Sequence, residues 1–440
     1  MFRVRTLLPT RSMILLGLVL LVGACATRPP ESAPPAAAGP TEAQRAAAAA
    51  SSRAKQSLPA PAQASAAAGV PGAEPHVALL LPLTGRQSGA AATVRDGFLT
   101  AYYVGPTAGR PRVRIYDTGS IGVAQAIDTA TRGGAWFIVG PLTREAVAAA
   151  AQLPAPRPPI LALNFLPAGS ESPANFYQFA LSPEGEAHDV AMRVLADGHQ
   201  RGVALAPDGD WGTRVLTAFR AALTAGGGTL LAVSRYDPLR TSYAPAITDV
   251  LGIDESTDRY RRVRSIVGGK LAFQPRLRGD IEFIFAPGSA ASARLLTPQL
   301  KYFFAGNLPT YATSEAFEPN PSADEDLEGL EFPGMPWMLG SGLADSVRLA
   351  ASAAWPVGGP PRNRLFAFGF DAYRLLLALH AEPGTASPEG SLAIEGLTGQ
   401  LTLDATGHVH RQLEWAQMHD GQPRLLAPPQ PAPAPAPAPA

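Results

Sequence analysis

Between residues 76 and 426, short apolar runs alternate with longer segments in which apolar residues recur every three or four positions. The short runs predict buried β-strands, and the 3.6-residue period predicts amphipathic helices. The predicted strands cover residues 77–81, 112–116, 136–139, 160–163, 202–206, 230–235, 281–285 and 309–312. The predicted helices cover residues 91–103, 123–131, 145–152, 185–196, 212–225, 289–303 and 371–380.

This alternation is typical of an α/β fold with parallel sheets that carry helices on both faces. The number of strand–helix units favours two open-sheet lobes, and a single closed barrel is the main alternative. In open α/β sheets, the loops at the carboxyl ends of the strands line the ligand crevice. The candidate crevice-lining residues are therefore Leu83, Thr84, Gly85, Ser88, Leu142, Thr143, Asn164, Phe165 and Asp208.

The first 24 residues have the pattern of a secretory signal, with a basic start, an apolar run over residues 13–22 and small residues before Cys25. Cys25 is the only cysteine of the chain, and the sequence LVGAC resembles a bacterial lipobox. The resemblance implies cleavage after Ala24 and a lipid on Cys25. Because Ala26 follows instead of Asp, the analogy places the anchor in the outer membrane, facing the periplasm. An ordinary signal peptide with a chance cysteine is the alternative.

Two segments lack the large apolar residues that a packed core requires. Residues 25–75 consist mainly of Ala, Pro, Ser and Gly, and residues 427–440 repeat Pro and Ala. Such compositions cannot bury enough apolar surface to offset the entropy cost of ordering the chain. We expect a disordered tether that follows the lipidated cysteine, and a disordered tail at the other end.

Charge and motifs exclude several functional classes. Lys+Arg and Asp+Glu are equal at 36 each, so the formal net charge is zero and gives no electrostatic support for nucleic-acid binding. The Gly-rich turn at residues 85–89 lacks the spacing of a dinucleotide fingerprint, and neither the G-x-S-x-G nor the H-E-x-x-H motif of hydrolases occurs. His408 and His410 could begin a metal site, but a solvated strand face is the favoured reading because zinc needs three or four ligands. We expect no enzyme activity, no cofactor and no metal.

Several long stretches together resemble the LpoA family of lipoprotein activators of penicillin-binding proteins. The stretches are VALLLPLTGRQSGAAATVRDGFLTAYY, FIVGPLTREAV, RGDIEFIFAPGSAASARLLTPQLKYFFAGNLPTYATSEAF, FAFGFDAYRLL and GLTGQLTLDATGHVHRQLEWAQMHDG. The family's domain has the type I periplasmic-binding-protein fold. The resemblance implies a first lobe of residues 76–179 and 313–397, and a second lobe of residues 180–312 and 398–426, which includes strands at 401–403 and 410–418.

The resemblance also implies a function. Family members are not enzymes; they bind a bifunctional class A penicillin-binding protein, a peptidoglycan synthase, and stimulate its transpeptidase activity in cell-wall synthesis. Better-known relatives carry a long N-terminal domain of helical repeats, for which the tether of about fifty residues is too short.

Two other functions remain in view. A lipid-anchored receptor for an amino acid would share the fold, and an enzyme would use the Gly-rich turns. The crevice loops carry the bulky side chains of Leu83, Leu142 and Phe165, so a small-molecule ligand is not expected.

Two stretches are candidates for a partner surface. Met335, Trp337 and Met338 lie in a segment that reads as a loop, where aromatic and Met residues often anchor an interface. The alternative is that they plug the base of the first lobe. A second stretch is basic and includes Arg261, Arg262 and Arg264, for which a solvated face is the alternative.

Overall fold

The computed structural model describes residues 73–268, 272–352, 355, 359–381 and 392–427. The predicted signal peptide, Cys25, nearly all of the tether and nearly all of the tail lie outside these residues. None of the helices in the described part of the chain is long and apolar enough to cross a lipid bilayer.

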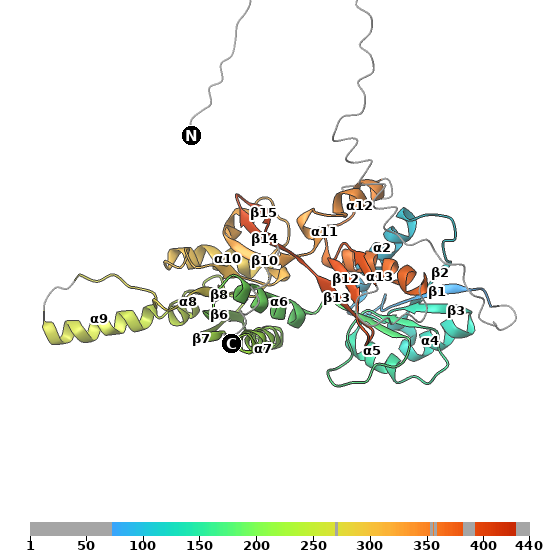
Figure 1. Ribbon diagram of the computed structural model, residues 1–440, viewed down its shortest axis with the longest axis horizontal. Coiled ribbons are helices and arrows are strands. Elements are labelled where there is room, and N and C mark those ends of the chain that lie inside the picture. The colour runs from blue at the N-terminus through green and yellow to red at the C-terminus, as the bar shows by residue number, and fades with distance from the viewer. Residues whose placement is uncertain (1–72, 269–271, 353–354, 356–358, 382–391, 428–440) are drawn as a thin grey trace, which may run out of the picture. The chain divides into compact units, whose positions relative to one another are not determined.

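The described chain forms two sheets, which confirms the prediction of two α/β lobes rather than a barrel (Figure 1). The sheet of the first lobe has eight strands in the order β11-β12-β13-β5-β4-β3-β1-β2. Its strands are β1 (His76–Leu81), β2 (Val113–Asp117), β3 (Ala135–Val139), β4 (Ile160–Ala162), β5 (Phe176–Phe179), β11 (Ala393–Glu395), β12 (Gln400–Leu403) and β13 (His408–Gln412). β1 to β5 and β13 pair in parallel, whereas β11, β12 and β13 pair antiparallel.

The sheet of the second lobe has seven strands in the order β15-β14-β10-β9-β8-β6-β7. Its strands are β6 (Arg201–Pro207), β7 (Thr229–Tyr236), β8 (Phe283–Phe285), β9 (Thr310–Tyr311), β10 (Leu330–Gly334), β14 (Glu414–His419) and β15 (Gln422–Leu425). The pairings from β7 to β10 are parallel, and those of β14 with β10 and β15 are antiparallel.

Helices cover both faces of each sheet, as the apolar strands require. In the first lobe these are α2 (Ser88–Val104), α3 (Thr118–Ile121), α4 (Val123–Arg132), α5 (Arg144–Ala151), α11 (Pro336–Leu339), α12 (Ala344–Ala351) and α13 (Arg364–Ala381). In the second lobe they are α6 (Pro183–Ala196), α7 (Asp210–Ala225), α8 (Ala244–Val250), α9 (Ile253–Val267), α10 (Ala290–Tyr302), η1 (Ser314–Ala316) and η2 (Asp324–Leu327).

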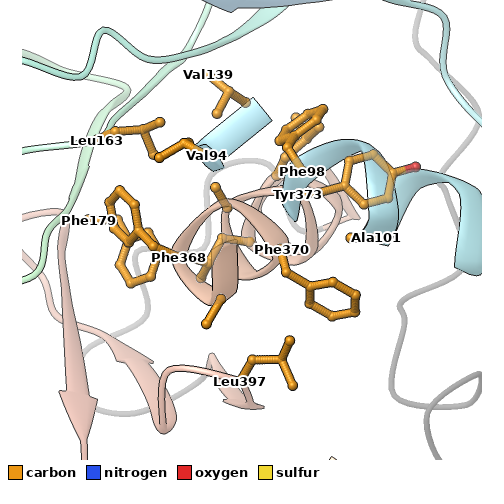
Figure 2. Packing of buried hydrophobic residues seen from close by; sticks show 14 of the residues in the cluster. Val94, Phe98, Ala101, Val139, Leu163, Phe179, Phe368, Phe370, Tyr373 and Leu397 are labelled. Carbon is orange, nitrogen blue, oxygen red and sulfur yellow. The ribbon is translucent and has the colours of Figure 1, made fainter. Parts of the chain in front are cut away.

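The core of the first lobe is built around the contact between α2 and α13 (Figure 2). The two helices meet at glycines: a Cβ on Gly97 would lie 1.9 Å from the Phe366 carbonyl oxygen, and one on Gly369 would lie 1.9 Å from the Val94 carbonyl oxygen. Phe98 packs edge-on against Tyr373, with ring centroids 5.1 Å apart. The glycines therefore let two backbones touch while aromatic side chains fill the space on either side.

The chain passes between the lobes three times, and this corrects the expected lobe boundaries. It passes from β5 to α6, from β10 to α11 and from β13 to β14. Residues 330–334 were expected in the first lobe, but β10 pairs with β9 and β14 in the second sheet. Residues 400–412 were expected in the second lobe, but β13 pairs with β5 in the first sheet. Strand pairing, which the apolar pattern does not encode, decides these memberships.

All the predicted strands and helices are present, and most ends lie within a few residues of those expected. The exceptions are α13, which begins seven residues before the predicted start at 371, and the long strand expected at 410–418, which is split between β13 and β14. The structure adds elements that the pattern did not predict, among them β5, β10, α8, α9 and α12. Helix α9 was missed because most of its residues are polar and only Ile253 and Ser256 are buried. Amphipathic periodicity identifies a helix only when one of its faces packs on a core.

Candidate functional site

Leu83 and Thr84, at the end of β1, are held by Asp117, which ends the neighbouring strand β2. The carboxylate of Asp117 accepts hydrogen bonds from the backbone N–H of Leu83 (2.8 Å), Thr84 (3.2 Å) and Gly119 (2.9 Å). Desolvation acts to raise the pKa of Asp117, but the hydrogen bonds from Thr84, Gly119 and Leu83 outweigh it and lower the pKa. The polar groups that could hold a ligand here stabilise the loop itself.

The next two loops also use their polar side chains internally. The hydroxyl of Thr143 accepts a hydrogen bond from Ala146 N–H at 3.3 Å and so caps the start of α5. The amide of Asn164 donates to the Leu142 carbonyl at 3.1 Å and accepts from Phe165 N–H at 3.0 Å. These side chains stabilise the turns after β3 and β4.

The remaining candidate crevice residues allow a turn, begin a helix or are exposed to solvent. Gly85 has a φ of +86°, which favours glycine, and a Cβ there would meet no atom within 4 Å. Ser88 is the first residue of α2, and Asp208 is exposed just beyond β6. The expected crevice residues therefore do not form one ligand site: among them, only Phe165 lines either of the two hollows described next.

The larger hollow is a groove of about 1850 Å³, the crossover groove, which follows α6 and the passage from β13 to β14. Glu186 and Arg411 line it and form a buried ion pair, with Oε1 and Nη2 3.1 Å apart. Arg411 also donates to the Ala180 carbonyl at 3.2 Å, and Glu186 accepts from Ser314 N–H at 3.2 Å. The pair therefore joins strand β13 of the first lobe to α6 and η1 of the second.

The smaller hollow, the acidic cavity, has a volume of about 400 Å³. Three carboxylates line it, those of Glu186, Glu315 and Glu318, together with Arg364, which donates to the Ser314 hydroxyl at 3.2 Å. Burial is the main cause that raises the pKa of Glu315; Glu186 adds to the rise, and Arg364 opposes it. A cavity of this size and charge could accept a small cationic group, but both oxygens of Glu186 already have partners.

Neither hollow was foreseen from the sequence. Glu315 lies just beyond the carboxyl end of β9, so the rule that located the other crevice loops could have found it. Glu186 and Arg411 are 225 residues apart in the chain, and only the pairing of β13 with β5 brings them together. No local pattern carries that information.

The expectation of a partner surface at Met335, Trp337 and Met338 is wrong. The three side chains are 1%, 0% and 5% exposed and belong to the core of the first lobe. The indole N–H of Trp337 donates to the Pro361 carbonyl at 2.9 Å, and its ring stacks on Phe366. The segment is not a loop but the end of β10 followed by α11. The alternative, that these residues plug the lobe, is the one the structure supports.

The basic stretch lies on α9, which extends from α8 (Figure 1). Every residue from 261 to 268 is exposed, including Arg261, Arg262 and Arg264. Arg261 pairs with Asp258 at 3.0 Å. The expected basic surface is therefore accessible, although exposure alone does not identify a partner.

The histidines considered as metal ligands have other partners. Nε2 of His410 lies 2.7 Å from the carboxylate of Asp404, and Nδ1 of His408 lies 2.7 Å from the Thr406 hydroxyl. Within the described ranges, one group of three potential ligands comes together, Glu328, His419 and Asp420, with ligand atoms within 4.8 Å of one another. Nδ1 of His419 faces Glu328 and Nε2 faces Asp420, so the ring bridges the two carboxylates as it stands.

Comparison with known proteins identifies relatives of this chain. The penicillin-binding protein activator LpoA of Photobacterium profundum is 29% identical over 345 residues, which are 78% of this chain and 55% of the relative. The chain thus spans about half the length of that relative.

Two solved structures share the fold. The LpoA (YraM) C-domain from Haemophilus influenzae, a regulator of PBP1A, matches with a TM-score of 0.58 and 25% identity, over 80% of this chain and all of that domain. A solute binding protein of an ABC transporter from R. palustris, in complex with benzoate, matches with a TM-score of 0.51 and 16% identity, over 81% of this chain and 96% of its own. The periplasmic-binding-protein-like fold expected from the sequence is therefore confirmed.

The family itself follows from a match that covers most of the folded chain. Residues 73–421 match the family model described as "LppC putative lipoprotein". This span contains both sheets up to the hairpin between β14 and β15. The chain belongs to the LppC lipoprotein family.

Proposed function

We propose that this chain is an outer-membrane lipoprotein that binds a class A penicillin-binding protein and activates its transpeptidase. The observation that carries the proposal is the match over the full length of the Haemophilus influenzae C-domain, whose name gives it as a regulator of PBP1A. The site geometry supports a regulator, because Asp117, Thr143 and Asn164 form hydrogen bonds within the strand-end loops instead of facing a ligand. Activation would then follow from tighter binding to the active conformation of the synthase than to its inactive one.

The decisive test measures peptide crosslinking by the purified synthase. Adding residues 76–440 should raise the crosslinking rate, because both lobes are complete in that span. A pull-down from solubilised envelope with the same domain would identify the synthase. No effect on any class A synthase of the same cell would remove the activator proposal.

The anchor is a separate proposal that rests on Cys25 and the LVGAC sequence. Cys25→Ser should leave the protein unlipidated and move it out of the outer-membrane fraction, since stable anchoring requires acyl chains in the bilayer. Fractionation of the envelope, followed by immunoblotting, measures this. A variant that stays with the outer membrane would contradict the anchor.

The tether must then span part of the distance to a synthase in the inner membrane. A flexible coil of fifty residues has a root-mean-square span of about 40 Å, whereas a fully polyproline-like one approaches roughly 150 Å. Deleting half of residues 26–75 should abolish function in cells and leave crosslinking by the purified domain unchanged. Full complementation by the shortened lipoprotein would refute this argument about reach.

The contact surface that we propose includes the basic side chains of α9. Changing Arg261, Arg262 and Arg264 together to Glu should weaken binding to the synthase at low salt, with a smaller effect at high salt. The matched control changes Arg86, Arg112 and Arg132, which are exposed on the first lobe, to Glu. If both triple variants weaken binding equally, only net charge matters and α9 is not a specific contact.

A lipid-anchored solute receptor is the alternative, and a thermal-shift assay separates it from the activator. Amino acids, nucleotides and muropeptides should give no saturable shift, because Asp117, Thr143 and Asn164 use their polar groups to bond the backbone of the strand-end loops. A ligand at a hundred times its dissociation constant would add about 2.7 kcal/mol to the unfolding free energy, which is easily detected. A clear saturable shift would favour the receptor.

A further inference from the structure

The chain leaves the second sheet in a direction that leads along the crossover groove. β15 runs antiparallel to β14, with Leu425 opposite Ala416, so the residues after β15 run back toward the passage from β13 to β14. The N–H of Leu426 donates to the Trp415 carbonyl at 2.8 Å, which continues this pairing by one residue. Leu425, Leu426 and Trp415 all line the groove. The last described residues therefore lie beside the groove and point along it.

Arg193 of α6 fixes this exit at the groove wall. Its Nη1 donates to the carbonyl of Ala427, the last described residue before residues 428–440, at 3.1 Å. Its guanidinium also lies over the Trp415 ring, 5.2 Å from the centroid, and its Nε pairs with Asp197 at 2.8 Å. The Arg193 side chain is only 10% exposed and lines the groove. Residue 428 therefore starts at the wall of the groove.

The groove next to this exit has an exposed apolar surface. Met192 of α6 is 48% exposed, and Leu425 is 54% exposed. Leu195 and Trp415 are partly exposed, and all four side chains line the same hollow. Large apolar side chains that share a hollow commonly mark a contact surface. The segment that follows Ala427 begins beside this surface.

The charges of the groove favour an uncharged occupant. Five carboxylates and two arginines line it, so it offers no attraction to an anionic lipid head group. The fifth carboxylate, that of Glu395, lies on β11 in the first lobe. The other four have a side-chain partner, in the pairs Glu186–Arg411, Asp189–His188, Asp404–His410 and Glu414–Ser341. None of the side chains of residues 428–440 is charged, so this segment would leave these pairs undisturbed.

The composition of residues 428–440 fits a groove of this kind. Proline alternates with alanine from residue 431 to residue 440, and proline fixes φ near −65°. Such a sequence favours polyproline II geometry, which apolar grooves with aromatic side chains recognise. At about 3.1 Å per residue the segment reaches about 40 Å, whereas α6 is only about 21 Å long. The segment is therefore long enough to follow the whole of α6, which forms one wall of the groove.

Strand pairing offers no other way to hold this segment along the passage between the lobes. β13, which follows the passage on the first-lobe side, already pairs with β12 and β5 on its two edges. Proline also lacks the N–H group that a strand pairing requires. Contact must therefore come from the packing of side chains in the groove.

We propose that the crossover groove is the docking site of the chain's own carboxyl-terminal segment, residues 428–440, which lies in it in polyproline II geometry. The prolines pack on Met192, Leu425 and Trp415, next to the exit. The docked segment removes apolar surface from water and keeps the groove closed to other proteins. The inference does not depend on the proposed function, which places the contact with the synthase on α9.

The direct covalent link favours this segment over a second copy of the chain or a separate protein. A segment joined to the edge of its site has an effective concentration on the order of millimolar. A separate molecule competes only when its own concentration is comparable. The tail therefore fills the groove for most of the time if the same peptide, without the link, binds with a dissociation constant below about 1 mM.

The test measures the binding of a fluorescent peptide with the sequence of residues 428–440, PPQPAPAPAPAPA, by fluorescence anisotropy. The shortened chain of residues 26–427 keeps every described strand of both sheets, the last of which ends at Leu425. It should bind the peptide with a dissociation constant below about 1 mM. The chain of residues 26–440 should bind the peptide several-fold more weakly, because its own tail competes for the groove.

A matched pair of variants locates the site. Met192→Glu in the shortened chain places a charge on the groove wall and should weaken peptide binding about tenfold. Leu349→Glu is the control, because Leu349 is 55% exposed on α12, outside the residues that line the groove. It should leave the affinity unchanged. Circular dichroism checks that both variants fold.

Each outcome bears on the inference. A dissociation constant above about 1 mM, or equal binding by the full and the shortened chain, would overturn the docked tail. Equal peptide binding by the two Glu variants would also overturn it, because the peptide would then bind outside the groove. Sedimentation of residues 26–440 tests the remaining occupant: a dimer that is lost without residues 428–440 would assign the groove to the tail of a second copy. These assays contain no synthase, so their failure would leave the proposed function standing.

Discussion

Helices α13 and α9 each carry an aspartate followed by an arginine three residues later, in opposite environments. In α13, Asp371 and Arg374 are 0% and 1% exposed, and their closest charged atoms are 3.9 Å apart. In α9, Asp258 and Arg261 are 56% and 73% exposed, and the distance is 3.0 Å. The shorter ion pair is the one that solvent screens, so distance alone does not rank the two contributions to stability.

Hydrogen bonds connect the buried pair on α13 to another part of the first lobe. Asp371 accepts from the N–H of Leu397 (3.0 Å) and Thr398 (2.7 Å) and from the Thr398 hydroxyl (2.7 Å). Arg374 donates to the Glu395 carbonyl. Burial raises the pKa of Asp371 and lowers that of Arg374, and the attraction between the two opposes both shifts. The buried pair bonds α13 to the turn between β11 and β12. The pair on α9 joins two residues of the same helix.

Removing the buried acid should have the largest effect. Asp371→Ala leaves the N–H groups of Leu397 and Thr398 and the Thr398 hydroxyl without their acceptor, and it removes the buried charge opposite Arg374. It should cost about 3–5 kcal/mol of unfolding free energy. Urea denaturation followed by circular dichroism measures this. Asp371→Asn keeps the side-chain shape and should cost less. A loss below about 1 kcal/mol for the alanine variant would mean that the buried pair contributes no more to the unfolding free energy than the exposed pair.

Gly369→Ala should have the next largest effect. The new methyl group would meet the Val94 carbonyl oxygen of α2, so the helices must separate, at a cost of about 1–3 kcal/mol. The control is Gly268→Ala at the end of α9, where a Cβ meets no atom within 4 Å and only the left-handed φ of +67° is strained. Equal losses for the two variants would show that backbone conformation, not the helix contact, sets the cost at Gly369.

Asp404 sharpens the comparison because its side chain is only 34% exposed and is held by hydrogen bonds. Desolvation acts to raise its pKa, but bonds from Thr406, His410 and His408 N–H outweigh it and lower the pKa to about 2. The ordinary value is about 3.9, so this stabilisation is present above about pH 4 and is lost as the pH falls through about 2. The stability difference between wild type and Asp404→Asn, measured by denaturation at several pH values, should therefore vanish in strong acid. A difference that stays undiminished down to pH 2 would point to a cause other than ionisation.

The exposed pair on α9 should give the smallest effect. Asp258→Ala removes the partner of Arg261 and should change the unfolding free energy by no more than about 0.5 kcal/mol. The same denaturation measurement, repeated at high salt, should show no further change. A loss near that of Asp371→Ala would contradict the contrast between the two helices.

The same contrast explains which elements the sequence predicts. The carboxyl-terminal part of α13 was foreseen because Leu375, Leu376 and Leu379 continue an apolar pattern, but its first two turns, residues 364–370, were missed. Helix α9 was not predicted, because only Ile253 and Ser256 are buried and a helix without a packed face leaves no period in the sequence. Strand β10 was missed because Pro333 and Gly334 suggest a loop, although the strand is central enough to pair on both sides.

The candidate site shows a sharper limit of prediction. The positions of Leu83, Leu142 and Phe165 at strand ends could be predicted, because the period of the pattern locates each strand end. The hydrogen bonds within these loops could not be predicted. They depend on the carboxylate of Asp117, which ends the neighbouring strand, and on the amide of Asn164 within its turn. Trp337 was assigned to two alternatives because composition cannot tell a buried plug from an exposed anchor. Only its packing on Phe366 decides between them.

The three passages of the chain between the lobes have a consequence for the order of folding during synthesis. The first sheet needs β13 at residues 408–412, and the second needs β14 and β15, which end at Leu425. A polypeptide made amino end first therefore cannot complete either sheet until almost all of its folded span has been delivered. Neither lobe can finish folding ahead of the other, and the two become stable nearly together once the last strands are present.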